Sequence, residues 1–232
     1  MALMVVQLVL IGMIGYLWGA IPAGYWMGKL LRGKNFDIRD YGSHKIGATN
    51  VNRTLGRIPA IIVLVFDLTK GVLPPLFALL VPFFHVMGWG PTVAALAALV
   101  GHCFPVFIGF KGGRGVATGG GAVLIISPPA FLVAAITLVG TIAISRYVSL
   151  GSILGSLSVA ICGILFFFLG WVGIPQVVYM VLGPALVIGL HYDNIGRLLA
   201  GTESKLGQKA KMEEPQPSGQ ALDLMNFDNQ KR

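Results

Sequence analysis

The sequence predicts an all-α integral membrane protein with seven transmembrane helices, one of them short. The chain has 232 residues, of which 55% are hydrophobic and only 11% are charged, and its mean hydropathy is +0.79. A soluble domain of this size would need far more charge. The apolar residues form long stretches, and most reach the roughly 20 residues that span about 30 Å of hydrocarbon. Basic residues gather in the connections on only one side of these stretches.

Six long apolar stretches and one short stretch supply the expected helices. The long ones are Met4–Gly28, Ile58–Pro82, Pro91–Phe110, Pro129–Ile144, Leu150–Gly170 and Ile174–Gly189. No small-residue cleavage pattern follows the first, so we expect a retained helix and not a signal peptide. The short stretch, Val116–Ser127, has about 12 residues, enough to cross only where the bilayer thins or protein surrounds it. Pro128 and Pro129 close its outer turn, because proline cannot continue a helix.

The placement of charge predicts the orientation of the chain. The connections 83–90, 127–129 and 171–175 contain no Lys, Arg, Asp or Glu. The opposite side carries Arg32, Lys34, Arg39, Lys45, Arg53, Arg57, Lys111, Arg114, Arg146 and Arg197. The positive-inside rule places that side in the cytoplasm. We therefore expect the N-terminus outside and the C-terminus inside.

The chain is expected to divide into one transmembrane domain, 1–201, and a polar tail, 202–232. The tail has balanced charge and little apolar content, which predicts disorder. The net charge of +8 therefore belongs to the cytoplasmic loops and helix ends. There it suits anionic lipid headgroups and phosphorylated substrates, and its placement argues against nucleic acid. Cys103 and Cys162 lack metal-ligand spacing, so neither a disulfide nor a metal site is expected.

The first of four polar clusters is the stretch 42–53, GSHKIGATNVNR. Its small residues let backbone amides approach a ligand closely. The side chains of Ser43, Thr49, Asn50 and Arg53 are the kinds of donor that a phosphate needs. The alternative is a solvated loop that caps the next helix.

The second cluster, FKGGRGVATGGG at 110–121, places glycines and the cations Lys111 and Arg114 at the start of the short helix. A helix N-terminus with free amides is a natural anion site. Alternatively, the glycines allow close helix packing and Lys111 only anchors a helix end. The stretch is not a Walker A loop, since no Gly-Lys-Ser/Thr follows at the required spacing.

The remaining two clusters are weaker signals when taken alone. The stretch RYVSLGS at 146–152 begins with an Arg-Tyr pair, which is an ordinary anchor at a membrane interface. In the fourth cluster His191 and Asn194 are three residues apart and share a helix face. A lone interfacial histidine, however, is more often structural than functional.

Three ionisable residues lie within apolar segments. Asp67 would lie about 14 Å and Lys70 about 18 Å along the second long helix, where an unpaired charge costs several kcal/mol. Being three residues apart, they can pair with each other, and we expect a structural ion pair, with a role in the polar site as the alternative. His102, in the sequence GHCFP, is either a hydrogen-bonded structural histidine or a catalytic one.

Five stretches of the chain resemble the bacterial membrane-integral family of acyl-phosphate glycerol-3-phosphate acyltransferases, the PlsY type. They are GATNVNR (47–53), DLTKG (67–71), GHCFPVFIGFKGGRGVAT (101–118), RYVSLGS (146–152) and HYDNIGRLLAGTESK (191–205), in the family's order and spacing. The resemblance implies a multi-pass protein of the bacterial inner membrane with its active site on the cytoplasmic side. It implies transfer of a fatty acyl group from acyl phosphate to the sn-1 hydroxyl of glycerol 3-phosphate. The products are lysophosphatidic acid and phosphate, in the first committed step of phospholipid synthesis.

The same resemblance assigns roles to particular residues. The expected catalytic residues are Ser43, Arg53, Ser152, His191 and Asn194. The expected phosphate-binding residues, taken from the first two clusters, are Thr49, Asn50, Lys111, Gly112, Gly113, Arg114, Gly115 and Thr118. No metal or other cofactor is implied, and the expected partners are the two substrates, the lipid bilayer and an upstream enzyme that forms acyl phosphate.

The chain departs from the family pattern at two places. His44-Lys45 replaces the usual Gly-Asn after the first serine, which puts a ring and a cation inside the expected phosphate cradle. Arg114 replaces the usual lysine, which keeps the charge and adds a bidentate fork. The first change is the more serious for substrate geometry, and it raises the alternative of a variant paralogue.

The residues themselves fit this chemistry. Two phosphorylated substrates would explain the cationic loops, and an acyl chain would explain a site at the membrane boundary. An acyl phosphate is already activated, so no nucleophile with a matched base is needed, and no G-x-S-x-G elbow is present. A transporter or flippase for a phosphorylated metabolite is the alternative. It needs polar groups lining a path to both faces of the membrane, and the outer third of the expected membrane-spanning region has almost none. A structural scaffold would leave the glycine and cation cluster unexplained.

Overall fold

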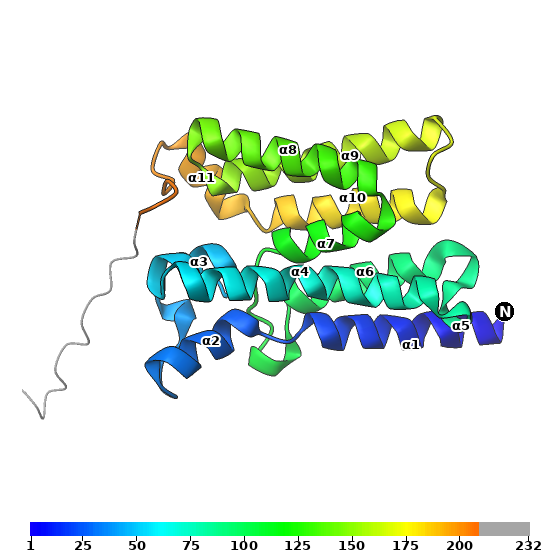
Figure 1. Cartoon of the computed structure of the whole chain (residues 1–232), viewed down its shortest axis with the longest axis horizontal. Helices are drawn as coiled ribbons and strands as arrows, with labels where there is room; N and C mark the ends of the chain where they lie inside the picture. The colour runs from blue at the N-terminus through cyan, green and yellow to red at the C-terminus, as the bar shows by residue number, and fades with distance from the viewer. Residues whose placement is uncertain (209–232) are drawn as a thin grey trace, which may run out of the picture.

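The computed structural model describes residues 1–208, and within that range the regular structure is entirely helical (Figure 1). The α-helices are α1 (Ala2–Gly19), α2 (Ala23–Arg32), α3 (Ala48–Thr54), α4 (Arg57–Leu80), α5 (Pro82–His85), α6 (Trp89–Cys103), α7 (Val116–Ile126), α8 (Pro128–Ser145), α9 (Val148–Phe168), α10 (Ile174–Gly189) and α11 (Tyr192–Leu199). Short 3-10 turns lie at Ile38–Asp40, Val86–Gly88 and Val106–Ile108. The predicted all-α class is confirmed.

Length and hydropathy make five helical segments of the described chain long and apolar enough to cross a membrane. The pair α10 and α11, bent by 58°, forms a sixth when taken together. The short helix α7 coincides with the expected short stretch, Val116–Ser127, and has 11 residues. A multi-pass membrane protein is therefore supported, whereas the count of seven spans and the orientation of the termini remain predictions.

Two expected helices end differently from the sequence prediction. The first stretch, Met4–Gly28, is divided at 20–22, where Pro22 precedes α2 and lacks the N–H that would continue α1. The stretch Pro91–Phe110 stops being helical at Cys103, because Pro105 disfavours a helical conformation at Phe104. The apolar residues that follow form a loop, in which the Phe110 amide donates to the carbonyl of Pro105 at 2.9 Å.

The helices run side by side in two groups, with α7 between them (Figure 1). In one group α6 packs against α1 and α4, and in the other α9 packs against α8 and α10. Helix α7 contacts α4, α8 and α10, so of the two conditions that the sequence left open for this short segment, surrounding protein is met. At the crossing of α4 and α7, a methyl group at Gly71 would collide with the Thr118 carbonyl, and one at Gly121 with the Leu68 carbonyl. Glycine at both positions lets the backbones approach closely.

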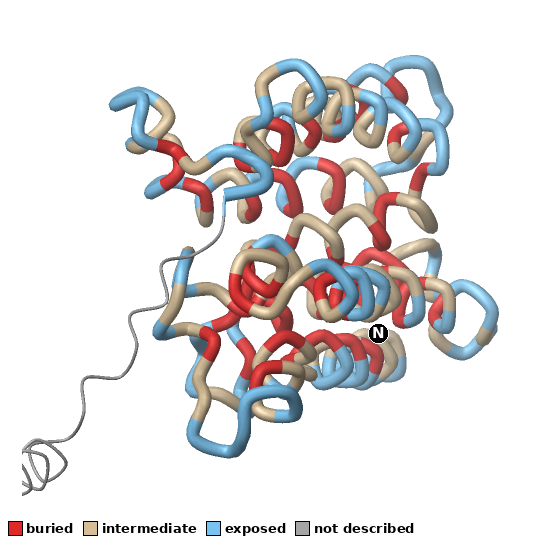
Figure 2. The backbone as a smooth tube through the Cα atoms, turned by 60° about the vertical axis from the view of Figure 1, so that its left-hand side comes forward, coloured by how far each residue is buried: buried red, intermediate tan, exposed pale blue. Residues whose placement is uncertain are grey.

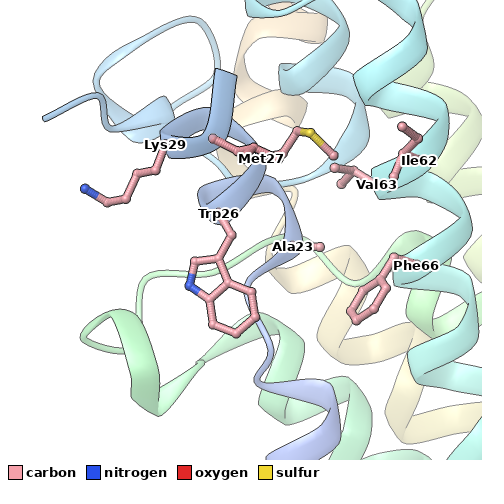
Figure 3. A pocket seen from close by; sticks show the side chains of 8 residues that line it. Ala23, Trp26, Met27, Lys29, Ile62, Val63 and Phe66 are labelled. Atoms are coloured by element: carbon pink, nitrogen blue, oxygen red, sulfur yellow. The ribbon is translucent and has the colours of Figure 1, made fainter. Parts of the chain in front are cut away.

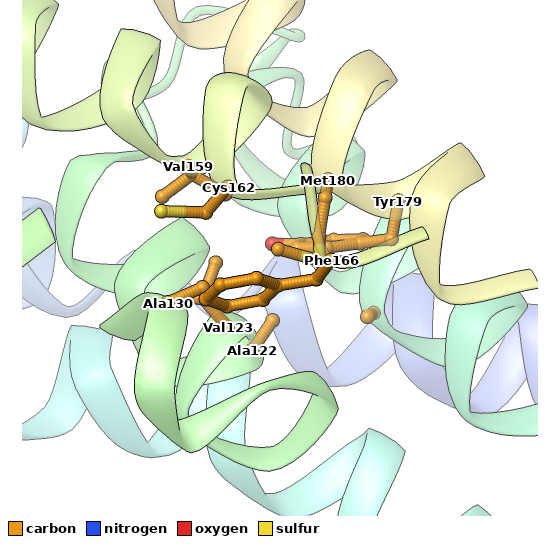
Figure 4. Packing of buried hydrophobic residues seen from close by; sticks show 9 residues of the cluster. Ala122, Val123, Ala130, Val159, Cys162, Phe166, Tyr179 and Met180 are labelled. Atoms are coloured by element: carbon orange, nitrogen blue, oxygen red, sulfur yellow. The ribbon is translucent and has the colours of Figure 1, made fainter. Parts of the chain in front are cut away.

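The largest buried apolar cluster joins α7, α8, α9 and α10 (Figure 4). Phe166 and Val159 of α9 face Val123 of α7, and Tyr179 of α10 donates a hydrogen bond to the Gly119 carbonyl at 3.0 Å. Outer helix faces are exposed (Figure 2). Many of the exposed side chains are large and apolar, such as Ile136 of α8, which is 65% exposed. Exposed apolar side chains on the outer helix faces are what a lipid environment permits.

Candidate active site

A cavity of about 700 Å³ brings the four predicted clusters together. One part of its wall is polar and includes Ser43, Lys45, Thr49, Asn50, Asn52, Arg53, Arg57, Arg114, Ser149, Ser152, His191, Asn194 and Glu203. The rest is an apolar groove that includes Leu64, Leu68, Val123, Phe131, Ala134, Leu138, Val139, Ile142 and Val159. The cavity thus joins a cationic end to a groove of the kind that holds an alkyl chain.

A second hollow, of about 560 Å³, lies between α2 and α4 (Figure 3). Its lining is apolar, with Trp26 and Phe66 on opposite sides, apart from Lys29. The Lys29 ammonium points away from the hollow and donates to the Lys34 carbonyl. None of the four polar clusters contributes to this hollow, so the chemistry belongs to the larger cavity.

In the first cluster, Asn50 holds the loop together. Its side chain is 1% exposed, and its Oδ1 accepts from the Ser43 amide at 2.8 Å. Its Nδ2 donates to the carbonyls of Ile38, Tyr41 and Lys45 at 3.1, 3.0 and 2.8 Å. Both ends of the amide are therefore occupied, and Asn50 shapes the cradle instead of offering a free donor.

The unusual His44 adopts a left-handed backbone conformation, with φ of 55°. Its Nδ1 lies 2.8 Å from the Arg39 carbonyl, and the Arg39 guanidinium in turn donates to the carbonyl of Ile108 at 2.8 Å. These contacts fasten the first cluster to the loop after α6. Lys45 then lines the cavity, so the first departure from the family pattern adds a cation to its wall.

The second cluster divides into packing residues and cavity residues. The amides of Gly112 and Gly113 donate to the carbonyls of Cys103 and His102, both at 3.1 Å, so they are not free for a ligand. The hydroxyl of Thr118 donates to the Asp67 carbonyl at 2.9 Å, and Lys111 is exposed outside the cavity lining. Of the residues expected here to bind phosphate, Arg114 and Gly115 line the cavity.

Two arginine side chains, Arg53 and Arg114, lie at the polar end of the cavity with little negative charge nearby to offset theirs. Burial lowers the pKa of Arg114, and the neighbouring positive charge of Arg197 lowers it further. Burial also lowers the pKa of Arg53, whose Nη2 donates to the Ser204 carbonyl at 3.4 Å. Arginine stays protonated in proteins, so both groups remain cations. The Nε of Arg114 is buried without a hydrogen-bond partner in the described chain, which leaves a donor available.

Glu203 organises the third and fourth clusters, although its place in the sequence did not predict it as a site residue. Its carboxylate accepts from Ser149 Oγ, Asn194 Nδ2 and Arg197 Nε, each at 2.7 Å. Burial raises the pKa of Glu203, but these three hydrogen bonds outweigh burial and leave the pKa below its usual value. The available signal was a single acidic residue amid the basic residues at the end of the fourth cluster.

Residues 202–208, which the sequence prediction assigned to a disordered tail, return to the site. The Leu206 amide donates to the Arg146 carbonyl at 2.7 Å, and Arg146 Nη2 donates to the Leu206 carbonyl at 3.3 Å. Together with the buried Glu203, these bonds hold the segment across the polar end of the cavity. The predicted boundary after 201 therefore falls before residues that build the site, and the rest of the predicted tail, 209–232, lies outside the described residues.

His191 and Asn194 both line the cavity, with His191 at the start of α11 and Asn194 in its first turn. His191 is 3% exposed, and its Nδ1 lies 2.7 Å from the Val187 carbonyl. Since a carbonyl only accepts, Nδ1 carries the proton and Nε2 is the acceptor in the neutral ring. Ser152 lines the same wall, with its hydroxyl donating to the Val148 carbonyl at 2.9 Å. The expected Asp67–Lys70 ion pair is confirmed at 2.6 Å.

A family model described as glycerol-3-phosphate acyltransferase matches residues 9–201. The chain belongs to this family. Among its relatives, "Glycerol-3-phosphate acyltransferase" of Desulforamulus reducens is 41% identical, with the match covering 84% of this chain and 92% of that one. "Glycerol-3-phosphate acyltransferase 2" of Moorella thermoacetica is 44% identical, over 85% and 96% of the two chains. The resemblance carried by the five sequence stretches is thereby confirmed.

Solved structures agree with the sequence relatives. The chain is similar to the crystal structure of PlsY, an integral membrane glycerol 3-phosphate acyltransferase, in its glycerol 3-phosphate form. The TM-score is 0.77 at 36% identity, covering 86% of this chain and 96% of that one. The lysophosphatidic acid form of PlsY matches with a TM-score of 0.74. This member of the acyltransferase family therefore shares the fold of an integral membrane protein.

Proposed function

We propose that this protein transfers a fatty acyl group from acyl phosphate to the sn-1 hydroxyl of glycerol 3-phosphate. The products are lysophosphatidic acid and inorganic phosphate. The observation that carries the proposal is the single cavity that joins a cationic end to an apolar groove. A soluble phosphorylated acceptor fits the first part, and the acyl chain of a lipid-like donor fits the second. The names of the relatives support the acceptor, and the donor and the position of acylation are our inference.

The charge of the cavity favours phosphate groups. The cations Lys45, Arg53, Arg57 and Arg114 line it. Its two carboxylates are already paired, Asp67 with Lys70 at 2.6 Å and Glu203 with Arg197 at 2.7 Å. The lining cations therefore have no matching negative charge in the wall, and an anionic substrate supplies it. A hydrogen bond to a charged group contributes about 1.5–3 kcal/mol, so two or three such contacts suffice for selective binding of a phosphate.

The reaction needs orientation more than an additional nucleophile. The acceptor hydroxyl oxygen forms a bond to the acyl carbon, the carbon–oxygen bond to phosphate breaks, and phosphate leaves with the electron pair. The hydroxyl proton passes to the departing phosphate, so the step balances without another reactant. Holding the two substrates in line replaces a bimolecular encounter, and fixed cations stabilise the charge that develops on the leaving group.

Within this scheme the site residues have distinct roles. Ser43, Arg53, Ser152, His191 and Asn194 orient the acceptor, with His191 Nε2 accepting a hydrogen bond from a substrate hydroxyl. Arg114, Thr49 and Gly115 hold phosphate at the cavity wall. Asn50, Gly112, Gly113 and Thr118 shape the loops that carry these groups, and Lys111 lies outside the lining.

The cellular setting is part of the same proposal. The site lies on the cytoplasmic side of the bacterial inner membrane, with seven membrane segments, the N-terminus outside and the C-terminus inside. Figure 1 places the N-terminus at the opposite end of the bundle from α3 and α11, which border the polar end of the cavity. An upstream enzyme must supply acyl phosphate.

The decisive experiment uses purified full-length protein with acyl phosphate and glycerol 3-phosphate. We expect phosphate release that depends on both substrates, together with 1-acyl lysophosphatidic acid as the product. Acyl-coenzyme A and acyl carrier protein are offered as donors in parallel. Transfer from either of these but not from acyl phosphate would contradict the proposed donor, and acylation at the second hydroxyl would contradict the proposed position.

A further inference from the structure

A buried network of ionisable side chains connects α4 with α6. Lys70 Nζ donates to Asp67 Oδ1 at 2.6 Å, and His102 Nδ1 lies 3.6 Å from the same oxygen. Lys70 is 0% exposed, and Asp67 and His102 are each 3% exposed. Both Asp67 and His102 also line the cavity. Such a network contributes little to stability compared with apolar residues of the same volume, which points to a function.

The imidazole of His102 lies between Asp67 and the glycine loop. Its Nδ1 is too far from Asp67 for a hydrogen bond, and it is buried with no partner within residues 1–208. On its other side, a Cβ at Gly113 would lie 2.9 Å from His102 Cε1 and 3.0 Å from Cδ2. Side-chain carbons essentially never approach so closely, so the ring and the glycine fit only as a pair.

The loop is fastened on its other side as well. The Gly113 amide donates to the His102 carbonyl at 3.1 Å, so ring and backbone of one residue hold Gly113 from two directions. Arg114 is the next residue, and it lines the cavity with its Nε unpartnered in the described chain. A displacement of Gly113 would therefore move the guanidinium directly.

We propose that Asp67 and His102 are positioning residues that set the place of Arg114 in the cavity wall. Lys70 fixes Asp67, and the Asp67 carboxylate lies against one side of the imidazole, 3.6 Å from Nδ1. The other side of the imidazole packs on Gly113 and seats it. The inference rests on the proposed function in taking the anion at Arg114 to be a substrate phosphate. A misplacement of about 1 Å can cost on the order of 10²-fold in rate, so a network that fixes the position of Arg114 would preserve the rate of transfer.

A double-mutant cycle between His102 and Gly113 tests this arrangement. The full-length protein carries His102→Ala, Gly113→Ala or both, and the dissociation constant of inorganic phosphate is measured together with KM and kcat for transfer. We expect Gly113→Ala to weaken phosphate binding roughly 10- to 100-fold, the scale of one lost hydrogen bond to the charged Arg114 side chain. His102→Ala should weaken it less. In the double variant the added methyl occupies the space that the ring has left, so binding should be no weaker than in His102→Ala alone.

Two variants serve as matched controls. Gly140→Ala adds the same methyl to a helix where nothing lies within 4 Å. His85→Ala removes an exposed imidazole outside the cavity lining. Both should bind phosphate and turn over like the unmodified protein. His102→Asn repeats the cycle with a smaller polar side chain if the alanine variant does not fold.

Independent, multiplicative losses in the double variant would overturn the proposal. So would a His102 variant that melts at a lower temperature but keeps its phosphate affinity and its KM, because the role would then be structural only. Coupling in phosphate binding without any acyl transfer by the unmodified protein would refute the proposed function and leave the positioning role standing. Acyl transfer by the unmodified protein, together with multiplicative losses in the double variant, would refute the positioning role and leave the proposed function standing.

Discussion

Replacing Glu203 with glutamine tests whether one buried carboxylate holds three parts of the site together. Glutamine keeps a carbonyl oxygen that can accept from Ser149 and Asn194, which now donate at 2.7 Å each. It loses the negative charge facing Arg197, whose Nε donates at 2.7 Å. We therefore expect a folded protein in which the segment 202–208 is less firmly held and the neighbouring cations repel one another.

The magnitude follows from the contacts. The Arg197 side chain is 41% exposed, so water screens part of the ion pair, and an exposed pair contributes at most about 1 kcal/mol. Converting the two hydrogen bonds to Glu203 from charge-assisted to neutral removes roughly another 1–2 kcal/mol in total. A loss of about 1–3 kcal/mol in the free energy of unfolding is expected for Glu203→Gln. Glu203→Ala should cost more, because the buried Asn194 amide then has no acceptor at that position.

The dependence on pH supplies the sharper test. Because its hydrogen bonds keep the pKa of Glu203 below the unfolded value, its contribution to stability is present above about pH 4.3. That contribution is lost as the pH falls through the folded pKa. Thermal melting in detergent between pH 3 and pH 7 should therefore show the unmodified protein converging on Glu203→Gln at low pH. A constant difference between the two over this range would refute the reasoning, as would equal stability at pH 7.

The other predictions concern the polar end of the cavity and the topology. Arg114→Ala should raise KM for glycerol 3-phosphate at least tenfold or abolish turnover, since a charged hydrogen bond contributes about 1.5–3 kcal/mol; unchanged kinetics would leave the second cluster as a packing feature only. Lys45→Asn removes one cavity cation and should weaken phosphate inhibition and flatten its salt dependence, with the exposed Lys111→Asn as control. If His191 orients the acceptor, His191→Gln or His191→Asn should recover part of the rate lost in His191→Ala; a general base would instead cost on the order of 10²–10⁴ in kcat in all three. Single cysteines at Met87 and Ser218 should label from opposite sides of the membrane, and labelling from one side would contradict the orientation.

Much of the fold follows from the sequence because a membrane imposes lengths on apolar segments. Helix α10 has the bounds Ile174–Gly189 that the sequence predicts, and α4 begins at Arg57 and ends at Leu80 beside the expected 58–82. The prediction was wrong where apolar character did not mean helix. Residues 104–110 are as apolar as a span, yet Pro105 and the left-handed Gly109 and Phe110 make them a loop.

The site shows a different division between what sequence can and cannot predict. The cavity brings together four clusters that the sequence identified one by one from their residue types. Which polar atoms remain free could not be read from the sequence. In a protein surrounded by lipid, backbone carbonyls must find donors within the chain, and Asn50, Gly112, Gly113 and Thr118 supply them.

Glu203 was missed for a related reason. Counting charge over 202–232 gives a balanced tail, and a balanced tail predicts a segment with nothing to bury. One carboxylate with three donors in reach reverses that prediction, because pairing with Ser149, Asn194 and Arg197 offsets the cost of removing it from water. Asp67 with Lys70 obeys the same rule in the interior, where sequence spacing alone revealed the partner. A buried charge is thus predictable when its partner lies within one helical turn, and it is missed when the partner comes from another helix.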